Sequence, residues 1–138
     1  MTSKLVEWSD EFSVGYKGID LQHMELVHLV NDFHAGIQKG GLMKKVYFLQ
    51  TIKGAVKYVK THFETEESLM MQVNYPYLNE HKREHENFIN EVTRQIQNFE
   101  KEDNPDPTGF DQYLLDWILN HIANSDKKYS PYLKDLPE

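Results

Sequence analysis

The sequence predicts an all-α fold, an antiparallel up-down-up-down four-helix bundle with an N-terminal arm. Turn-forming residues divide the 138-residue chain into an arm and four helix-sized intervals. Within an interval apolar residues recur every three or four positions, as Phe88, Val92, Ile96 and Phe99 do, and no period-two alternation is sustained. Asp20 and Thr108 are candidate N-caps of the first and last helices. Most connections are short, which favours antiparallel packing of consecutive helices.

The chain is expected to form one domain over residues 1–138. It begins with an arm, residues 1–19, whose Trp8 and Phe12 we expect to pack across the bundle. The four helices are expected near residues 20–39, 42–73, 77–101 and 110–129.

Composition and charge exclude several classes of function. The formal charge of -7 comes from 22 acidic and 15 basic residues, and no long run of lysine or arginine occurs, so nucleic acid is not an expected partner. Because the chain has no cysteine, disulfides, thiolate metal sites and thiol catalysis are excluded. No apolar run approaches the roughly 18 residues of a membrane span, and the first residues lack the apolar core of a signal peptide. We therefore expect a cytoplasmic protein without a membrane span.

The stretch HFETEESLM, residues 62–70, contains three glutamates within an otherwise amphipathic helix. Residues four apart lie about 40° from each other around a helix axis, so Glu66 shares the core-facing side with His62. Glu64 and Glu67 point elsewhere. A carboxylate in an apolar interior needs a cation or hydrogen-bond donors, so Glu66 is expected to have a partner there.

Every predicted helix directs at least one histidine toward the core. His23 lies on the apolar face of the first helix, His81 and His85 lie four apart on that of the third, and His121 lies on that of the fourth. In an antiparallel bundle these positions are all expected at the same end as His62, because they alternate between early and late in their helices.

This concentration of buried imidazoles predicts a metal centre. A single core histidine with a satisfied hydrogen bond is commoner than a metal ligand, but five such histidines and a carboxylate at one level have no simple structural explanation. Imidazole is a ligand of zinc, copper, iron and nickel. The number of candidate ligands exceeds what one ion needs, so we expect two ions.

The last expected carboxylate, Asp126, requires a departure from regular helix. It follows His121 by five residues, which an ideal α-helix places about 140° away. We therefore predict a π-type turn or a helix end between the two residues, which would direct the carboxylate inward.

The ordered set of motifs resembles the hemerythrin signature. It consists of His23, HFETE at 62–66, HKREH at 81–85 and HIANSD at 121–126. The segments WSDEFSVG at 8–15 and IDLQH at 19–23 are similar to the lead-in of that family. The resemblance runs from Trp8 to about Tyr129 and is greatest to single-domain bacterial members of the family.

The resemblance implies a non-haem di-iron centre that binds dioxygen reversibly, with two iron ions joined by a bridging oxo or hydroxo group. It implies three histidines on one iron, two on the other and two bridging carboxylates. In this chain the three histidines would be His81, His85 and His121, and the two histidines would be His23 and His62. The bridging carboxylates would be Glu66 and Asp126. Dioxygen is expected at the open position of the two-histidine iron, in an apolar pocket lined by Trp117 and Ile118.

Other polar residues are assigned no role at the centre. His34 lies about 16 Å along the helix axis from His23, so we expect a structural role for it. His28 is expected to be exposed. A solvated acidic face is expected to include Glu25, Glu64, Glu67 and Glu84.

Several functions are compatible with this centre. Oxygen storage or delivery, for example to an oxygen-consuming enzyme, fits best, and we expect a monomeric binding protein rather than an enzyme. A di-iron oxidase, peroxidase or NO-handling enzyme is the second hypothesis, although the Glu-x-x-His pairs of carboxylate-rich oxidative sites do not occur at the predicted positions. A third is an oxygen or iron sensor acting through a separate partner. A structural helical protein with incidental metal is the remaining alternative.

Overall fold

The computed structural model describes residues 7–39, 44–103 and 105–137, and all regular elements in these ranges are helical. Residues 1–6 of the predicted arm and positions 42 and 43 of the second predicted helix lie outside the described residues. The long helices are α1 (Lys17–Lys39), α2 (Lys44–Gln72), α3 (Leu78–Lys101) and α4 (Phe110–Asn120).

Shorter elements flank the bundle. A single 3-10 turn, η1 (Asp10–Phe12), lies in the arm. After α4 the chain continues without a break through a π-helical turn, η2 (His121–Asp126), into α5 (Lys127–Tyr129) and the 3-10 turn η3 (Ser130–Leu133). The predicted helix over 110–129 is therefore helical throughout, but it changes type from His121 onward.

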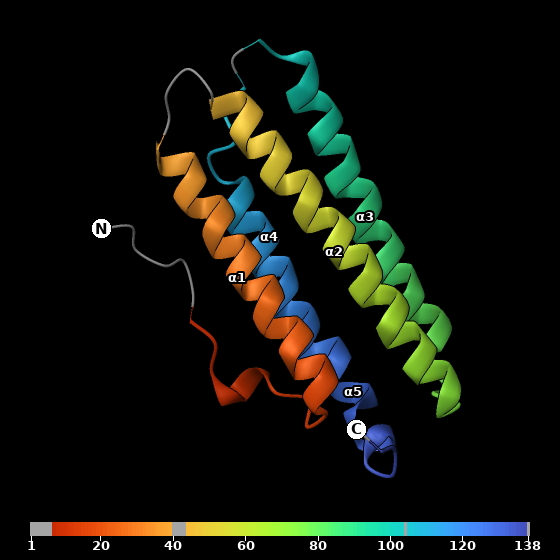
Figure 1. Cartoon of the computed structure of the whole chain (residues 1–138). Coiled ribbons are helices and arrows are strands. Elements are labelled where there is room, and N and C mark those ends of the chain that lie inside the picture. Colours follow the sequence, from red (N-terminus) through yellow and green to blue (C-terminus); the bar gives the residue numbers. More distant parts are fainter. Residues whose placement is uncertain (1–6, 40–43, 104, 138) are drawn as a thin grey trace.

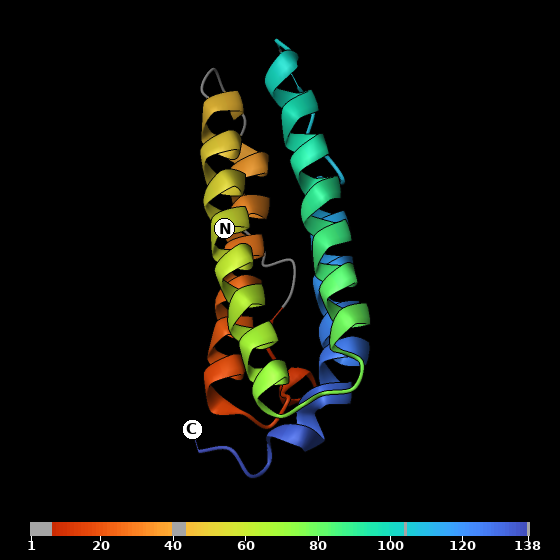
Figure 2. The ribbon, with the colours of Figure 1, turned by 90° about the vertical axis from the view of Figure 1, so that its right-hand side faces the viewer.

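The four long helices form the predicted antiparallel bundle, in which α1 lies beside α2 and α4, and α2 lies beside α3 (Figure 1). The beginnings of α1 and α3 and the ends of α2 and α4 lie at the same end of the bundle, as the view from the side also shows (Figure 2). This arrangement brings together the histidines that are far apart in sequence.

The two predicted N-caps, Asp20 and Thr108, are not the N-caps of α1 and α4. The helix α1 begins at Lys17 rather than near residue 20, so Asp20 lies inside its first turn. There the Asp20 carboxylate accepts the backbone N–H of Val14 at 2.8 Å and ties the arm to the helix. The N-cap of α4 is Gly109 and not Thr108, because the left-handed backbone at this position (φ 90°) favours glycine.

The apolar interior has a large and a small part. The large cluster runs along the bundle, and Phe12 of the arm packs against it with Trp8 beside it, at 5.6 Å between ring centroids. A smaller cluster at the site end of the bundle consists of Met70, Tyr75, Tyr129 and Leu133. Along α2, Glu66 falls between the large cluster and Met70, so a polar layer separates the two apolar parts.

Candidate metal centre

The polar layer contains all seven predicted ligand residues. Each of these side chains belongs to a residue that is at most 6% exposed; they are His23, His62, Glu66, His81, His85, His121 and Asp126. Their ligand atoms form two groups, and within each group these atoms lie within 4.8 Å of one another. The three-histidine group is His81, His85, His121 and Asp126, and the two-histidine group is His23, His62, Glu66 and Asp126.

Asp126 belongs to both groups. Its Oδ1 lies 3.0 Å from Nε2 of His81 and 3.1 Å from Nε2 of His121. Its Oδ2 lies 3.1 Å from Nε2 of His23. One oxygen of the carboxylate therefore faces each group, which is the arrangement that a bridging carboxylate needs.

The π turn explains how Asp126 reaches this position. His121 and Asp126 are the first and last residues of η2, and both are buried. In a π turn the hydrogen bonds span five residues, so residues five apart come onto the same side of the helix. The predicted departure from α-helix between these residues is confirmed.

Glu66 lies between the two groups on α2. Its Oε1 is 2.6 Å from Nε2 of His62 and 4.0 Å from Nε2 of both His23 and His85. Its Oε2 accepts a hydrogen bond of 2.5 Å from the hydroxyl of Tyr129. Tyr129 was not predicted at the centre, although its position three residues after Asp126 places it on the same helix face.

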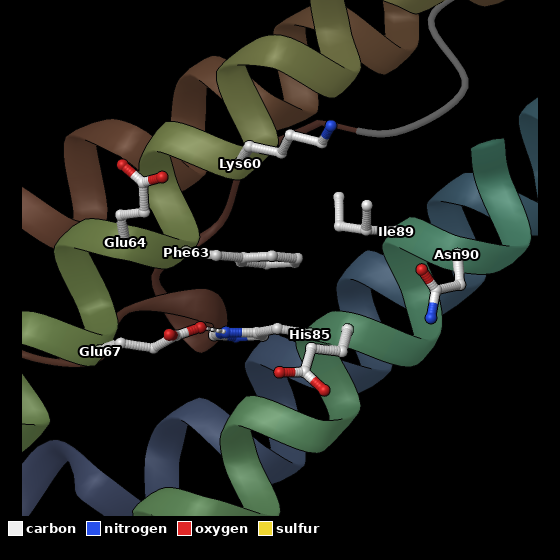
Figure 3. A pocket seen from close by; sticks show the side chains of 8 residues that line it. Lys60, Phe63, Glu64, Glu67, His85, Ile89 and Asn90 are labelled. Atoms are coloured by element: carbon white, nitrogen blue, oxygen red, sulfur yellow. Dashed lines mark hydrogen bonds and ion pairs between the residues drawn. The ribbon is translucent and has the colours of Figure 1, made fainter.

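Two residues of the expected acidic face, Glu67 and Glu84, contact histidines of the centre, which was not predicted. The Glu67 carboxylate accepts a hydrogen bond from Nδ1 of His85 at 2.8 Å, and Figure 3 shows this contact with Glu64 directed elsewhere. The Glu84 carboxylate lies 2.9 Å from Nδ1 of His121. Both contacts join different helices, so the position of a residue within its own helix could not predict them.

The centre holds buried polar atoms that its own residues leave unsatisfied. Within the described part of the chain, the buried side-chain nitrogen and oxygen atoms without a hydrogen-bond partner all belong to this centre. They are Nδ1 and Nε2 of His23, Oε1 of Glu66, Nε2 of His81, and both carboxylate oxygens of Asp126. Leaving such atoms unpaired is costly, so their convergence favours a bound cation.

In the metal-free centre the neighbouring carboxylates keep His23 and His121 protonated. Burial lowers the pKa of His23, but Asp126 and Glu66 outweigh burial and raise it to about 9. Burial likewise opposes a charge on His121, yet Asp126 and Glu84 raise its pKa to about 10. Burial, helped by the neighbouring imidazoles, lowers the pKa of His85 to about 3. At neutral pH His121 can therefore donate its Nε2–H to Nε2 of His85, 2.9 Å away.

Iron uptake by the metal-free protein is expected to release protons, because a metal must replace the protons on His23 and His121. At pH 7 both groups are below their raised pKa values, so roughly two protons per chain should leave on loading. Above about pH 10 both imidazoles are already neutral and the release from them should vanish. Anaerobic titration of weakly buffered protein with ferrous iron and a pH indicator at pH 7 measures this number; a release of less than one proton per chain would contradict it.

Aromatic rings pack on the histidines of the three-histidine group. The ring of Phe63 lies parallel to that of His85, with 3.6 Å between centroids (Figure 3), and Trp117 stacks on His121 at 4.5 Å. These contacts restrict ring rotation. Phe63 and His85 also line a charged surface pocket between α2 and α3, together with Lys60 and Glu64.

A small pocket adjoins the two-histidine group. It contacts His23, His62, His121 and Asp126. Its other walls are apolar and consist of Leu26, Val59, Phe63, Trp117, Ile118 and Ile122. Trp117 and Ile118, the two residues expected to line an oxygen pocket, therefore line a pocket that reaches His23 and His62 and also His121 of the three-histidine group.

The histidines left out of the predicted centre lie elsewhere. His34 contacts Asp111 through Nδ1 and connects α1 to the start of α4, which agrees with a structural role. The His28 side chain is 65% exposed and lies 3.3 Å from Asp32. Neither histidine contributes to the two groups of candidate ligands.

A four-helix bundle with two adjoining histidine and carboxylate groups in its core defines a metal-binding bundle protein. The model of the hemerythrin HHE cation binding domain matches residues 14–133. The chain belongs to the hemerythrin family.

Individual relatives agree with this assignment. The chain is 32% identical to a bacteriohemerythrin of Stenotrophomonas maltophilia, covering 94% of this chain and 82% of the relative. It is 30% identical to a bacteriohemerythrin of Clostridium acetobutylicum, covering 88% and 96%. The solved structure of a wild-type hemerythrin is similar with a TM-score of 0.83 and 26% identity, covering 94% of this chain and 98% of that one.

Family membership and the buried ligand groups together imply binding of non-haem iron and dioxygen. Proteins of this family are generally oxygen binders rather than enzymes. Among the described residues no helix is both long and apolar enough to cross a membrane.

Proposed function

We propose that this chain stores or delivers dioxygen by binding it reversibly at a non-haem di-iron centre. In this proposal His81, His85 and His121 hold one iron, and His23 and His62 hold the other. Glu66 and Asp126 would be shared by the two ions, together with an oxo or hydroxo group from solvent. When bound, the ferrous pair would supply the electrons for reversible reduction of dioxygen.

The observation that carries the proposal is the position of Asp126. A carboxylate with one oxygen toward each histidine group suits two ions better than one. The unsatisfied atoms of His23, His81 and Glu66 surround the same space. A donor set of imidazoles and carboxylates fits iron, whereas a set rich in carboxylate alone would favour harder ions.

The surrounding residues orient the ligands and exclude water. Tyr129 donates its hydroxyl to Glu66 and fixes the orientation of that carboxylate. The apolar pocket beside His23 and His62 excludes water from the half of the centre with fewer protein ligands. In the proposed arrangement that half would leave room for dioxygen.

Reversible binding is favoured over oxidase chemistry by the composition of the centre. It contains five histidines and two carboxylates, and it lacks the paired Glu-x-x-His motifs of oxidative di-iron bundles. The delivery of oxygen to an oxygen-consuming enzyme, a monomeric state and a cytoplasmic location stay predictions.

Metal analysis of the purified chain tests the proposed centre. We expect two iron ions per chain, in agreement with the two ligand groups, and Mössbauer spectra that resolve two iron environments. A single metal ion per chain, or zinc in place of iron after growth in iron-replete medium, would contradict the di-iron assignment.

Replacing Ile118 by asparagine is expected to accelerate autoxidation of the oxygenated protein. Ile118 lines the apolar pocket and is 5% exposed, so a polar side chain there would admit water near the proposed oxygen position. We expect an increase on the order of tenfold, which corresponds to about 1.4 kcal/mol in activation free energy. The decay of the oxygenated absorption band measures the rate. Ile118→Val, which keeps the pocket apolar, is the control; an equal rate in both variants would refute the role of polarity.

A further inference from the structure

The outward-facing nitrogens of three histidines have partners of different charge. Nδ1 of His85 lies 2.8 Å from Glu67, and Nδ1 of His121 lies 2.9 Å from Glu84. Nδ1 of His62 instead lies 2.6 Å from the amide oxygen of Gln22. An imidazole that donates its Nδ1–H outward presents the lone pair of Nε2 inward, where a metal would bind.

The two carboxylates support only the three-histidine group. Glu84 is itself held by the hydroxyl of Ser125 at 2.6 Å, and Ser125 belongs to the π turn that also carries Asp126. Glu67 reaches His85 along the wall of the pocket between α2 and α3 (Figure 3). The two-histidine group receives the neutral amide of Gln22. Neither nitrogen of His23 has a hydrogen-bond partner.

A carboxylate acceptor increases the basicity of an imidazole more than an amide acceptor does, because the ionised group polarises the N–H bond more strongly. A more basic imidazole donates more charge to a metal and stabilises its ferric form relative to its ferrous form. The carboxylates of Glu67 and Glu84 therefore act on the three-histidine half of the centre, and the amide of Gln22 acts on the two-histidine half.

We infer that Glu67, Glu84 and Gln22 are positioning residues that make the two halves of the centre unequal. Glu67 and Glu84 fix His85 and His121 in the ligating tautomer and strengthen metal binding in the three-histidine half. Gln22 fixes the tautomer of His62 without adding charge, so the two-histidine half holds its ion less tightly. This inference rests on the proposed di-iron function and assigns residues beyond the ligands to it.

Matched substitutions separate this role from a general effect of charge. Glu67→Gln and Glu84→Gln each remove one charge from a contact with a histidine, and Gln22→Glu adds one. Glu64→Gln and Glu86→Gln are the controls. They remove the same charge from exposed positions on α2 and α3 that have no hydrogen bond to a histidine of the centre.

The experiment measures iron loss from the loaded protein to a ferrous chelator and the midpoint potential in a redox titration, with helical content checked by circular dichroism. We expect Glu67→Gln and Glu84→Gln to lose iron about 10- to 100-fold faster and to have a higher potential. Gln22→Glu should lose iron more slowly and have a lower potential. The two control variants should behave as the wild-type chain does.

The outcomes distinguish this inference from the proposed function. If the wild-type chain holds two irons but Glu67→Gln and Glu84→Gln match the controls, the inference is wrong and the di-iron centre stands. A shift of Gln22→Glu in the same direction as Glu84→Gln would also overturn it, because a merely structural defect would then account for both. A wild-type chain that takes up no iron would overturn the proposed function and this inference with it.

Discussion

Substitution of Asp126 by alanine is expected to abolish iron binding at both positions while the bundle stays folded. This residue contacts histidines of both groups, at 3.0 and 3.1 Å through one oxygen and at 3.1 Å through the other. Its loss removes one ligand from each proposed ion and also the anion that raises the pKa of His23 and His121. The loss of affinity should exceed the roughly 100-fold that removal of an outer-shell partner costs.

Metal analysis after anaerobic reconstitution with ferrous iron measures this effect. The matched control is Asp116→Ala, which removes an exposed carboxylate from α4 that contacts Gln112 and not the centre. We expect the control to hold the same amount of iron as the wild-type chain. Retention of both irons by Asp126→Ala would show that this residue is not the bridge.

Removal of iron is expected to lower the thermal stability of the wild-type chain substantially. The ligands are preorganised only in the folded bundle, so the free energy of metal binding adds to the free energy of unfolding. A ligand present at about 1,000 times its dissociation constant contributes about 4 kcal/mol. For a domain of this size that corresponds to a decrease of about 8 to 16 °C in the unfolding temperature.

Calorimetry of the iron-loaded and chelator-treated forms tests this expectation. Asp126→Ala provides the control, since a chain that binds no iron should unfold at the same temperature before and after treatment with chelator. An unfolding temperature of the wild-type chain that does not depend on iron would indicate that the buried cluster is stable by itself.

The helical pattern was sufficient to predict the inward direction of most candidate ligands. His62 and Glu66 lie four apart, as do His81 and His85, and residues at this spacing share a face of a regular helix. Alternation of helix direction then predicted that they meet at one end. These inferences need only the period of the helix and short connections, both of which are visible in the sequence.

A regular α-helix does not predict the inward position of Asp126. Its spacing from His121 conflicts with an α-helix, and the prediction of a π turn depended on assigning Asp126 to the centre beforehand. Apolar periodicity contains no information on that local change. The start of α1 also differs from the prediction, because Asp20 is not its N-cap but ties the arm to the helix from inside the first turn.

The contacts around the ligands could not be predicted from single helices. Glu67 and Glu84 lie on faces that sequence periodicity assigns to solvent, and each reaches a histidine on a neighbouring helix. The same holds for the contact of Gln22 with His62 and for that of Tyr129 with Glu66. Such contacts depend on the distance and rotation between helices, which packing in three dimensions determines.

Reversible oxygenation is the central claim, and one spectroscopic experiment tests it most directly. The iron-loaded protein is reduced under anaerobic conditions, its iron per chain is quantified, and its visible absorption is followed while oxygen is admitted and then removed. We expect two irons per chain and a visible band that appears with oxygen and disappears when oxygen is withdrawn, over repeated cycles. Oxidation in a single step that consumes oxygen and cannot be reversed by its removal would contradict the claim and favour an oxidase or oxidant-handling enzyme.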